Sequence, residues 1–160
     1  MVRTEISLFL RNVPGELGKL ATTMAEANIN IDAMTIQDAS EYVRKLFKAR
    51  GKALKRVAPA ASYGSMKKDS ADYALIRLLV DNTDSAIDLL SRAGYVFDMI
   101  PIIALEIENR PGTLAELTKK FGEEKININY VYGSTLSGRE KSLFVFCPED
   151  IELAARIFKD

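Results

Sequence analysis

The feature that most constrains this chain is an internal repeat. Residues 6–31 align without a gap to residues 103–128 at a constant offset of 97. Identical residues in the two copies include the pairs Asn12/Asn109, Pro14/Pro111, Gly15/Gly112, Leu17/Leu114, Leu20/Leu117, Glu26/Glu123, Ile29/Ile126, Asn30/Asn127 and Ile31/Ile128. A repeat of this kind indicates that one supersecondary unit is built twice. Any fold assigned to the first copy must therefore also suit the second.

The match continues more weakly beyond these segments. Residues 74–79 resemble residues 141–146 at an offset near 68, about 29 less than before. The first copy therefore contains an insert of about 30 residues, which we place at roughly residues 41–71. Without it, the 160 residues form two repeats of about 65, each the size of a small domain. We expect the domain boundaries to be 1–100 and 101–160.

Apolar periodicity predicts the elements of each repeat. Ile6, Leu8 and Leu10 alternate with other residues as in a half-buried strand, whereas residues 17–27 carry apolar side chains at helical spacing. The same reasoning predicts strands at 6–10, 29–36, 75–80, 95–99, 103–107, 126–132 and 141–146, and helices near 17–27, 84–93, 114–121 and 154–158. The order βαββαβ is the ferredoxin-like arrangement. We therefore expect an α+β protein with two ferredoxin-like units, each an antiparallel sheet with helices on one face.

The second repeat ends soon after its second helix. It has no counterpart to the strand expected at residues 95–99 of the first repeat. An exposed sheet edge invites pairing with another chain. We therefore expect this edge to be left short or completed by another chain, and the protein to be a homodimer.

Composition excludes several classes of protein. With 48% apolar residues the chain can form a core. It contains no His, and its one Cys, Cys147, cannot form an internal disulfide. Nucleophile–imidazole pairs and imidazole metal ligands are therefore excluded, and no spacing of acidic, Lys or Tyr residues forms a catalytic set. We expect a protein that is not an enzyme and uses neither a metal nor a cofactor.

The sequence shows no sign of membrane insertion or secretion. No apolar run approaches the ~20 residues that span a bilayer, and the amino-terminal stretch lacks the apolar core of a signal peptide. We therefore expect no membrane span and a cytoplasmic location.

Each repeat has the sequence Asn-x-Pro-Gly between its first strand and its first helix. These loops, Asn12–Gly15 and Asn109–Gly112, open helices whose first amide N–H groups have no intrahelical partner. Such a helix end attracts an anion, for example the carboxylate of a free amino acid. The Asn amide can bind a carboxylate or an ammonium group, and Gly lets a ligand approach the backbone. The simpler alternative is that Asn and Pro-Gly only build a turn and cap the helix.

The two loops, each followed at the same distance by Ile-Asn-Ile, resemble the signature of ACT domains, which are small amino-acid-sensing regulatory modules. The matching residues are Asn12-Val13-Pro14-Gly15-Glu16-Leu17 with Ile29-Asn30-Ile31, and Asn109-Arg110-Pro111-Gly112-Thr113-Leu114 with Ile126-Asn127-Ile128. The resemblance covers the whole chain except the insert, as in stand-alone tandem ACT proteins. In the similar regulatory domain of phosphoglycerate dehydrogenase, Asn residues at these positions bind serine across an interface. That domain has a ligand-binding His where this chain has Leu10 and Ile107, so the resemblance does not favour serine as the effector.

Topology pairs each loop with the second strand of the other repeat. Within one repeat the loop Asn and the second-strand Asn lie about a strand length apart, roughly 15–20 Å, too far for one small ligand. Two opposed repeats can bring them together. We expect one site to join Asn109, Arg110, Pro111, Gly112, Thr113 and Leu114 to Asn30, Ile31 and Asp32. We expect the other site to join Asn12, Val13, Pro14, Gly15 and Leu17 to Asn127 and Ile128.

The site with the second loop is expected to bind the effector more tightly. Arg110 and Thr113 can donate to a carboxylate, and Asp32 can accept from an ammonium group. The other site has the uncharged Val13 and Asn129 at the positions of Arg110 and Asp32. The alternative is that Arg110 and Asp32 are ordinary solvated surface charges.

The insert concentrates positive charge. Residues 41–71 contain nine basic and two acidic residues, a net charge of +7, which leaves −7 on the rest of this neutral chain. Residues 41–57 follow a helical apolar spacing interrupted by Gly51, which predicts a basic amphipathic helix. We favour a helix that packs on the acidic body of the chain or on another subunit. Nucleic acid or another polyanion, a protein partner and a membrane surface are the less favoured alternatives.

We therefore expect a non-catalytic regulatory protein that binds a free amino acid at its Asn-x-Pro-Gly loops and acts on a partner, such as a regulated enzyme. One alternative is a transcriptional regulator that uses the basic insert, because stand-alone tandem ACT proteins also resemble the glycine-cleavage-system repressor. Another is the regulatory subunit of an amino-acid biosynthetic enzyme, similar to the acetolactate synthase small subunit.

Overall fold

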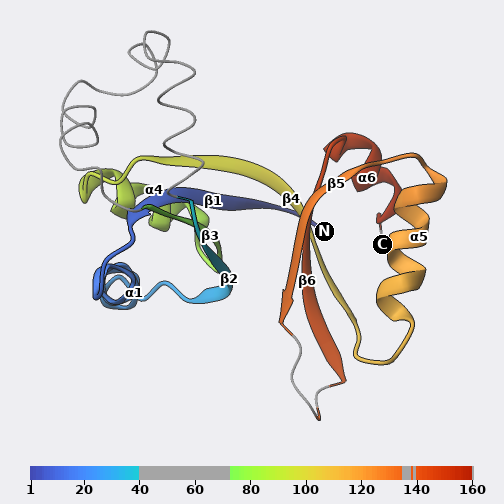
Figure 1. Ribbon diagram of the computed structural model, residues 1–160, viewed down its shortest axis with the longest axis horizontal. Coiled ribbons are helices and arrows are strands. Elements are labelled where there is room, and N and C mark those ends of the chain that lie inside the picture. The colour runs from blue at the N-terminus through green and yellow to red at the C-terminus, as the bar shows by residue number, and fades with distance from the viewer. Residues whose placement is uncertain (40–72, 135–137, 139, 160) are drawn as a thin grey trace, which may run out of the picture. The chain divides into compact units, whose positions relative to one another are not determined.

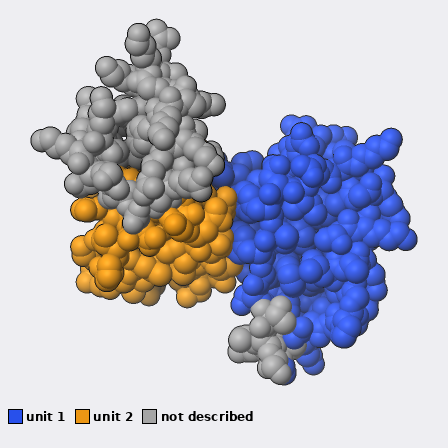
Figure 2. All heavy atoms as spheres, viewed as in Figure 1, with its two compact units in different colours: residues 1–5, 99–160 blue, residues 6–98 orange. Residues whose placement is uncertain are grey.

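The computed structural model describes residues 1–39, 73–134, 138 and 140–159. The basic helix predicted in the insert lies outside these residues. The chain divides into two compact units: unit 1 comprises residues 1–5 and 99–160, and unit 2 comprises residues 6–98 (Figure 2). Within the described ranges, no helix is both long enough and apolar enough to cross a membrane.

Strands and helices follow one another in the order expected for a duplicated βαββα pattern (Figure 1). In the first half they are β1 (Val2–Arg11), α1 (Glu16–Glu26), β2 (Ile31–Asp38), β3 (Tyr73–Val80) and α4 (Thr83–Arg92). In the second half they are β4 (Phe97–Glu108), α5 (Thr113–Glu123), β5 (Ile128–Ser134), β6 (Lys141–Pro148) and α6 (Ile151–Ile157).

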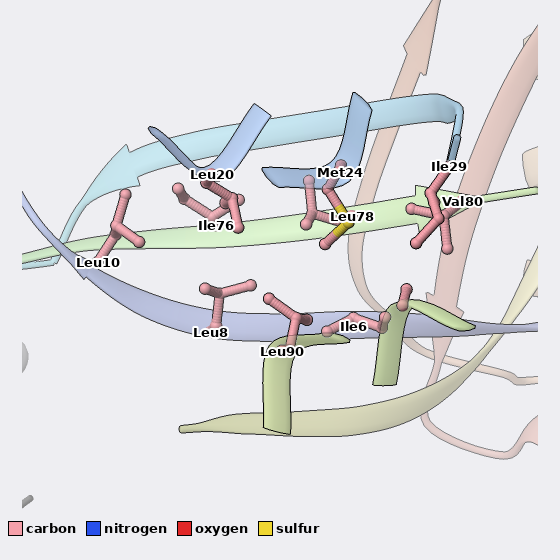
Figure 3. Packing of buried hydrophobic residues seen from close by; sticks show 11 residues of the cluster. Ile6, Leu8, Leu10, Leu20, Met24, Ile29, Ile76, Leu78, Val80 and Leu90 are labelled. Atoms are coloured by element: carbon pink, nitrogen blue, oxygen red, sulfur yellow. The ribbon is translucent and has the colours of Figure 1, made fainter. Parts of the chain in front are cut away.

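Unit 2 is a sheet covered on one face by α1 and α4. Its strands lie in the order β2-β3-β1, and both pairs are antiparallel. Successive side chains of a strand point to opposite faces, so alternate residues of β1 and β3 meet the helices. The buried core comprises Ile6, Leu8, Leu10, Leu20, Met24, Ile29, Ile76, Leu78, Val80, Ala86 and Leu90 (Figure 3).

Unit 1 repeats this design. Its strands lie in the order β4-β6-β5, again antiparallel, and α5 and α6 cover one face (Figure 1). Aromatic rings dominate its core: the Phe121 ring centroid lies 5.2 Å from that of Phe146 and 4.8 Å from that of Phe158. The predicted α+β class and the duplicated ferredoxin-like arrangement are confirmed.

The edge of unit 1 that was predicted to lack a strand is completed by the amino terminus of the same chain. Residues 1–5 belong to unit 1, and β1 is the neighbour of β4. The backbone N and O of Met1 pair with the O and N of Ala104 at 3.0 and 2.9 Å. Such a reciprocal pair belongs to an antiparallel ladder. The expectation of a short edge or a second chain there was wrong, because contacts between chain segments about 100 residues apart leave no local pattern.

Side chains also hold this amino-terminal segment in unit 1. Glu5 is fully buried, and its carboxylate accepts hydrogen bonds from the hydroxyls of Tyr130 at 2.6 Å and Tyr132 at 2.7 Å. Burial, followed by the hydrogen bond to Glu5, raises the pKa of the Tyr130 hydroxyl, which therefore stays protonated and donates at neutral pH. Two donors thus compensate a carboxylate that water does not reach.

The strands predicted separately at residues 95–99 and 103–107 form one continuous strand, β4. Pro101 lies inside this strand and is exposed. The backbone N–H of Ala104 points toward β1. Because successive residues of a strand point their N–H groups to opposite sides, the backbone nitrogen of residue 101 points toward β6. The β4–β6 ladder begins only at Ile103, so no described partner on β6 faces this nitrogen. Pro101 therefore removes no ladder hydrogen bond, which is where a strand tolerates proline.

The second strands begin two residues later than predicted, because Ile29 and Ile126 belong to the turns that follow α1 and α5. Their N–H groups bond back to the carbonyls of Met24 and Phe121, at 3.0 and 2.9 Å. The preceding residues, Asn28 and Lys125, have φ values of 55° and 58°. These bonds are those of a Schellman motif, in which a residue with positive φ is followed by an apolar contact.

Candidate functional site

The first Asn-x-Pro-Gly loop connects β1 to α1. Gly15 precedes the helix with a φ of 93°, which favours glycine, and its carbonyl accepts the first helical bond from Lys19 at 2.9 Å. Within the described part of the chain, no side chain caps α1. Asn12 therefore does not act as a helix cap, and the first N–H groups of α1 have no side-chain partner there.

A cavity of about 330 Å³ lies beside this loop. The loop supplies one wall, and the ends of the neighbouring strands and the first turn of α1 supply the rest. The lining residues are Leu10, Arg11, Asn12, Val13, Pro14, Gly15, Leu17, Ile36 and Ala74. The structure thus brings all five predicted residues of the first loop to one cavity, together with Ile36, which no sequence pattern indicated.

The second loop has the same backbone but different side-chain partners. Gly112 has a φ of 97° and, among the described residues, no side chain caps α5. Arg110 donates to Glu108 at 2.7 Å and to both carboxylate oxygens of Glu116 at 3.3 Å. The hydrogen bond to Glu108, then that to Glu116, raises the pKa of Arg110. A ligand carboxylate at Arg110 would therefore compete with two carboxylates of the protein.

Two hydroxyls near the second loop are buried. The side-chain oxygens of Thr113 and Ser142 have no hydrogen-bond partner among the described residues. Ser142 is 3% exposed and lies opposite Ile107 in the β4–β6 register. Ile107 precedes Asn109 of the loop by two residues. The counterpart of Ser142 in the first repeat is Ala74, which lines the cavity at the first loop. At this position the second loop therefore has a buried hydroxyl where the first has a methyl group.

In unit 1 a phenylalanine ring occupies the space that the Ile36 side chain occupies in unit 2. The equivalent residue is Gly133, and a Cβ placed there would lie 2.6 Å from the ring of Phe144, directly opposite it on β6. The ring of Phe144 therefore covers the backbone of Gly133.

Replacing Gly133 with alanine is expected to lower the free energy of unfolding by about 1–3 kcal/mol, because the ring must move out of a packed position. Urea denaturation measures the change. Gly122→Ala is the control, since Gly122 lies in α5 with open space around it and alanine there is expected to stabilise by about 0.5–1 kcal/mol. Equal stabilities of the Gly133→Ala variant and the parent would contradict this packing.

The predicted second-strand residues lie just after the helix ends. The backbone N–H of Asn30 donates to the side-chain carboxylate of Asp81 at 2.9 Å, and the carbonyl of Asn30 accepts from the backbone N–H of Asp81 at 3.1 Å. The Asn30 amide also donates to Asp32 at 3.1 Å. In unit 1 the carbonyl of Asn127 accepts from the N–H of Glu149 at 2.8 Å. Each Asn backbone is thus fixed to the start of the loop that follows the third strand of its repeat.

The remaining predicted residues are divided between core and surface. Ile31 and Ile128 pack against the cores of their own units. Asn127 lines a cavity of about 480 Å³ with Lys125, Ile126, Glu149, Asp150, Ile151 and Leu153. Asn109, Pro111, Gly112 and Leu114 are exposed at the second loop. The pairing of each loop with the second strand of the other repeat stays a prediction.

Comparisons with solved structures confirm the fold. The chain is similar to protein BT0572 from Bacteroides thetaiotaomicron, with a TM-score of 0.71, 21% identity, and coverage of 98% of this chain and 86% of that one. It is also similar to the regulatory subunit of aspartate kinase from Thermus flavus, with a TM-score of 0.54, 17% identity, and coverage of 98% and 92%. The corresponding Thermus thermophilus subunit has a TM-score of 0.52, 15% identity, and coverage of 99% and 96%. No curated protein matches the chain.

A family model identifies the relationship at the level of sequence. The model described as an ACT domain pair matches residues 51–158, which is more than half of the chain. This match agrees with the duplicated βαββα pattern and with the two glycine-ended loops that open α1 and α5. The chain therefore belongs to the ACT domain pair family.

Proposed function

We propose that this protein is a non-catalytic regulator that binds a free amino acid at its Asn-x-Pro-Gly loops and transmits the binding to a partner protein. The observation that carries the proposal is the cavity at the first loop, where Asn12 adjoins a helix start that no described side chain caps. Membership of the ACT domain pair family supports the same conclusion.

The chemistry of the loop suits an amino acid. N–H groups in the first turn of α1 point out of the helix and carry its positive end, which favours a carboxylate. The Asn12 amide can donate to the same carboxylate, and its oxygen can accept from the α-ammonium. Both loops offer this backbone geometry, so Asn109 and the residues after it form the second candidate site.

Replacing Asn12 with alanine is expected to weaken binding of the effector about 10- to 100-fold, which corresponds to the loss of a hydrogen bond to a charged group. Thermal-shift screening against the common amino acids identifies the effector first, because a ligand that binds only the folded state raises the melting temperature. Isothermal titration calorimetry then compares the parent with Asn12→Ala and Asn109→Ala. If no amino acid stabilises the parent, or if both variants keep the parent's affinity, the proposal is wrong.

Binding regulates only if the effector favours one of two states of the protein or its complex. Two of the structural neighbours are regulatory subunits of aspartate kinase, and we propose a partner of this general class, an enzyme of amino-acid synthesis. Affinity capture from the source cells, with and without the effector, tests this. An enzyme that co-purifies and whose activity responds to the amino acid supports the proposal, whereas an enzyme whose activity ignores the amino acid opposes it.

A further inference from the structure

Apolar surface makes up slightly more than half of the lining of the first-loop cavity. Five of its lining residues have aliphatic side chains: Leu10, Val13, Leu17, Ile36 and Ala74. Its polar side chains are those of Arg11 and Asn12, which lie together at the end of β1. A ligand whose polar group binds at Asn12 therefore places the rest of its atoms against aliphatic carbon.

Two of these residues are unusually exposed for their type. Val13 is 41% exposed and Ile36 is 44% exposed, whereas Leu10 and Ala74 beneath them are buried. Exposed apolar side chains are common singly, but a group of them around a cavity marks a binding surface. An apolar ligand group placed here would cover both Val13 and Ile36.

The side chains at the corresponding positions of unit 1 are different. Arg110, Gly133 and Ser142 stand at the positions of Val13, Ile36 and Ala74. Arg110 is held by two carboxylates, and the ring of Phe144 covers Gly133. The backbone of the two loops is the same, so the difference lies in the side chains that would surround the rest of the ligand.

We propose that the first loop selects an amino acid with an aliphatic side chain. This inference rests on the proposed function and names the class of effector. The carboxylate binds at the start of α1 and at Asn12, and the side chain lies between Val13, Leu17 and Ile36, over Leu10. A volume of about 330 Å³ is near the lower limit for ligand sites, which suits one amino acid rather than a larger metabolite.

Calorimetric titration of the full chain with leucine, isoleucine, valine, alanine and serine tests the class. Each methylene group buried against aliphatic walls is expected to strengthen binding roughly fourfold. We therefore expect at least one of the three branched amino acids to bind at least tenfold more tightly than alanine or serine. Equal or tighter binding of serine would overturn the inference.

The variant Ile36→Thr assigns the selectivity to this cavity. Threonine keeps the β-branched shape but replaces apolar surface with a hydroxyl, so we expect affinity for the preferred branched amino acid to fall at least fivefold. Alanine binding should change less than twofold. Met34→Thr is the matched control, because Met34 is 39% exposed two residues earlier on β2 and does not line the cavity. Equal affinities of the two variants for the branched amino acid would contradict the assignment.

The two proposals fail in different ways. A polar amino acid that binds tightly and loses affinity in Asn12→Ala would refute aliphatic selection but support amino-acid binding at this loop. Absence of binding by every amino acid would refute both. Circular dichroism and thermal melts of each variant show whether it is folded, and Ile36→Val supplies a conservative substitution that should retain most of the affinity for the branched amino acid.

Discussion

Replacing Glu5 with alanine is expected to lower the free energy of unfolding by about 3–5 kcal/mol, because it leaves two hydrogen-bond donors without their acceptor and removes a fully buried side chain. The carboxylate is fully buried and accepts hydrogen bonds from Tyr130 and Tyr132. Without it, two tyrosine hydroxyls lose their acceptor at positions partly shielded from water, and each such loss costs about 1–3 kcal/mol. The substitution also removes one of the contacts that hold the amino-terminal segment in unit 1, and leaves the backbone pair between Met1 and Ala104.

Urea denaturation measures this effect, with Tyr132→Phe and Glu5→Gln as controls. Tyr132→Phe removes one hydrogen bond and leaves the other, so it should cost about 1–2 kcal/mol. Glu5→Gln keeps an acceptor oxygen but places an amide donor against a hydroxyl, so its stability should lie between those of the parent and Glu5→Ala. A Glu5→Ala variant whose free energy of unfolding lies within about 1 kcal/mol of the parent's would show that the carboxylate contributes little.

Replacing Phe121 with alanine also lowers the free energy of unfolding by about 3–5 kcal/mol, because it removes a fully buried ring and leaves a cavity. Phe121 is the centre of the aromatic cluster in unit 1 and contacts the rings of Phe146 and Phe158. Neither neighbour can fill the space without leaving its own packed position. The loss should therefore be near the upper end of the range for core substitutions.

The repeat supplies a control for this position. Met24 occupies the equivalent place in the core of unit 2 and is also fully buried. Phe121→Met therefore introduces a side chain that the fold already accepts there, and we expect it to cost only about 1–2 kcal/mol. Exposed Lys119→Ala, on the outer side of the same helix, should change stability by less than about 0.5 kcal/mol. If Phe121→Ala behaved like Lys119→Ala, the packing of unit 1 described above would be wrong.

Much of the candidate site could be predicted from the sequence. Both loops open helices, as predicted from Pro-Gly between a strand and a helical pattern; only the structure shows that no described side chain caps those helices. The sequence could not reveal that Arg110 is held by Glu108 and Glu116, because three charged residues close in sequence can pair in several ways until the turn sets their directions. Nor could it reveal that Ile36, more than 20 residues beyond the loop, lines the same cavity.

The sequence alone determined the duplication, the order of elements and the apolar face of each helix. These properties follow from local signals: alternation in strands, helical spacing of apolar residues, and turn residues between them. Only the tertiary structure decided that the amino-terminal segment completes the sheet of unit 1, where Met1 pairs with Ala104 and Glu5 meets Tyr130. The same holds for the cavity at the first loop and for the ring of Phe144 that covers Gly133 in the second repeat. Such contacts join residues far apart in sequence, and their energies depend on distances and burial that no local pattern encodes.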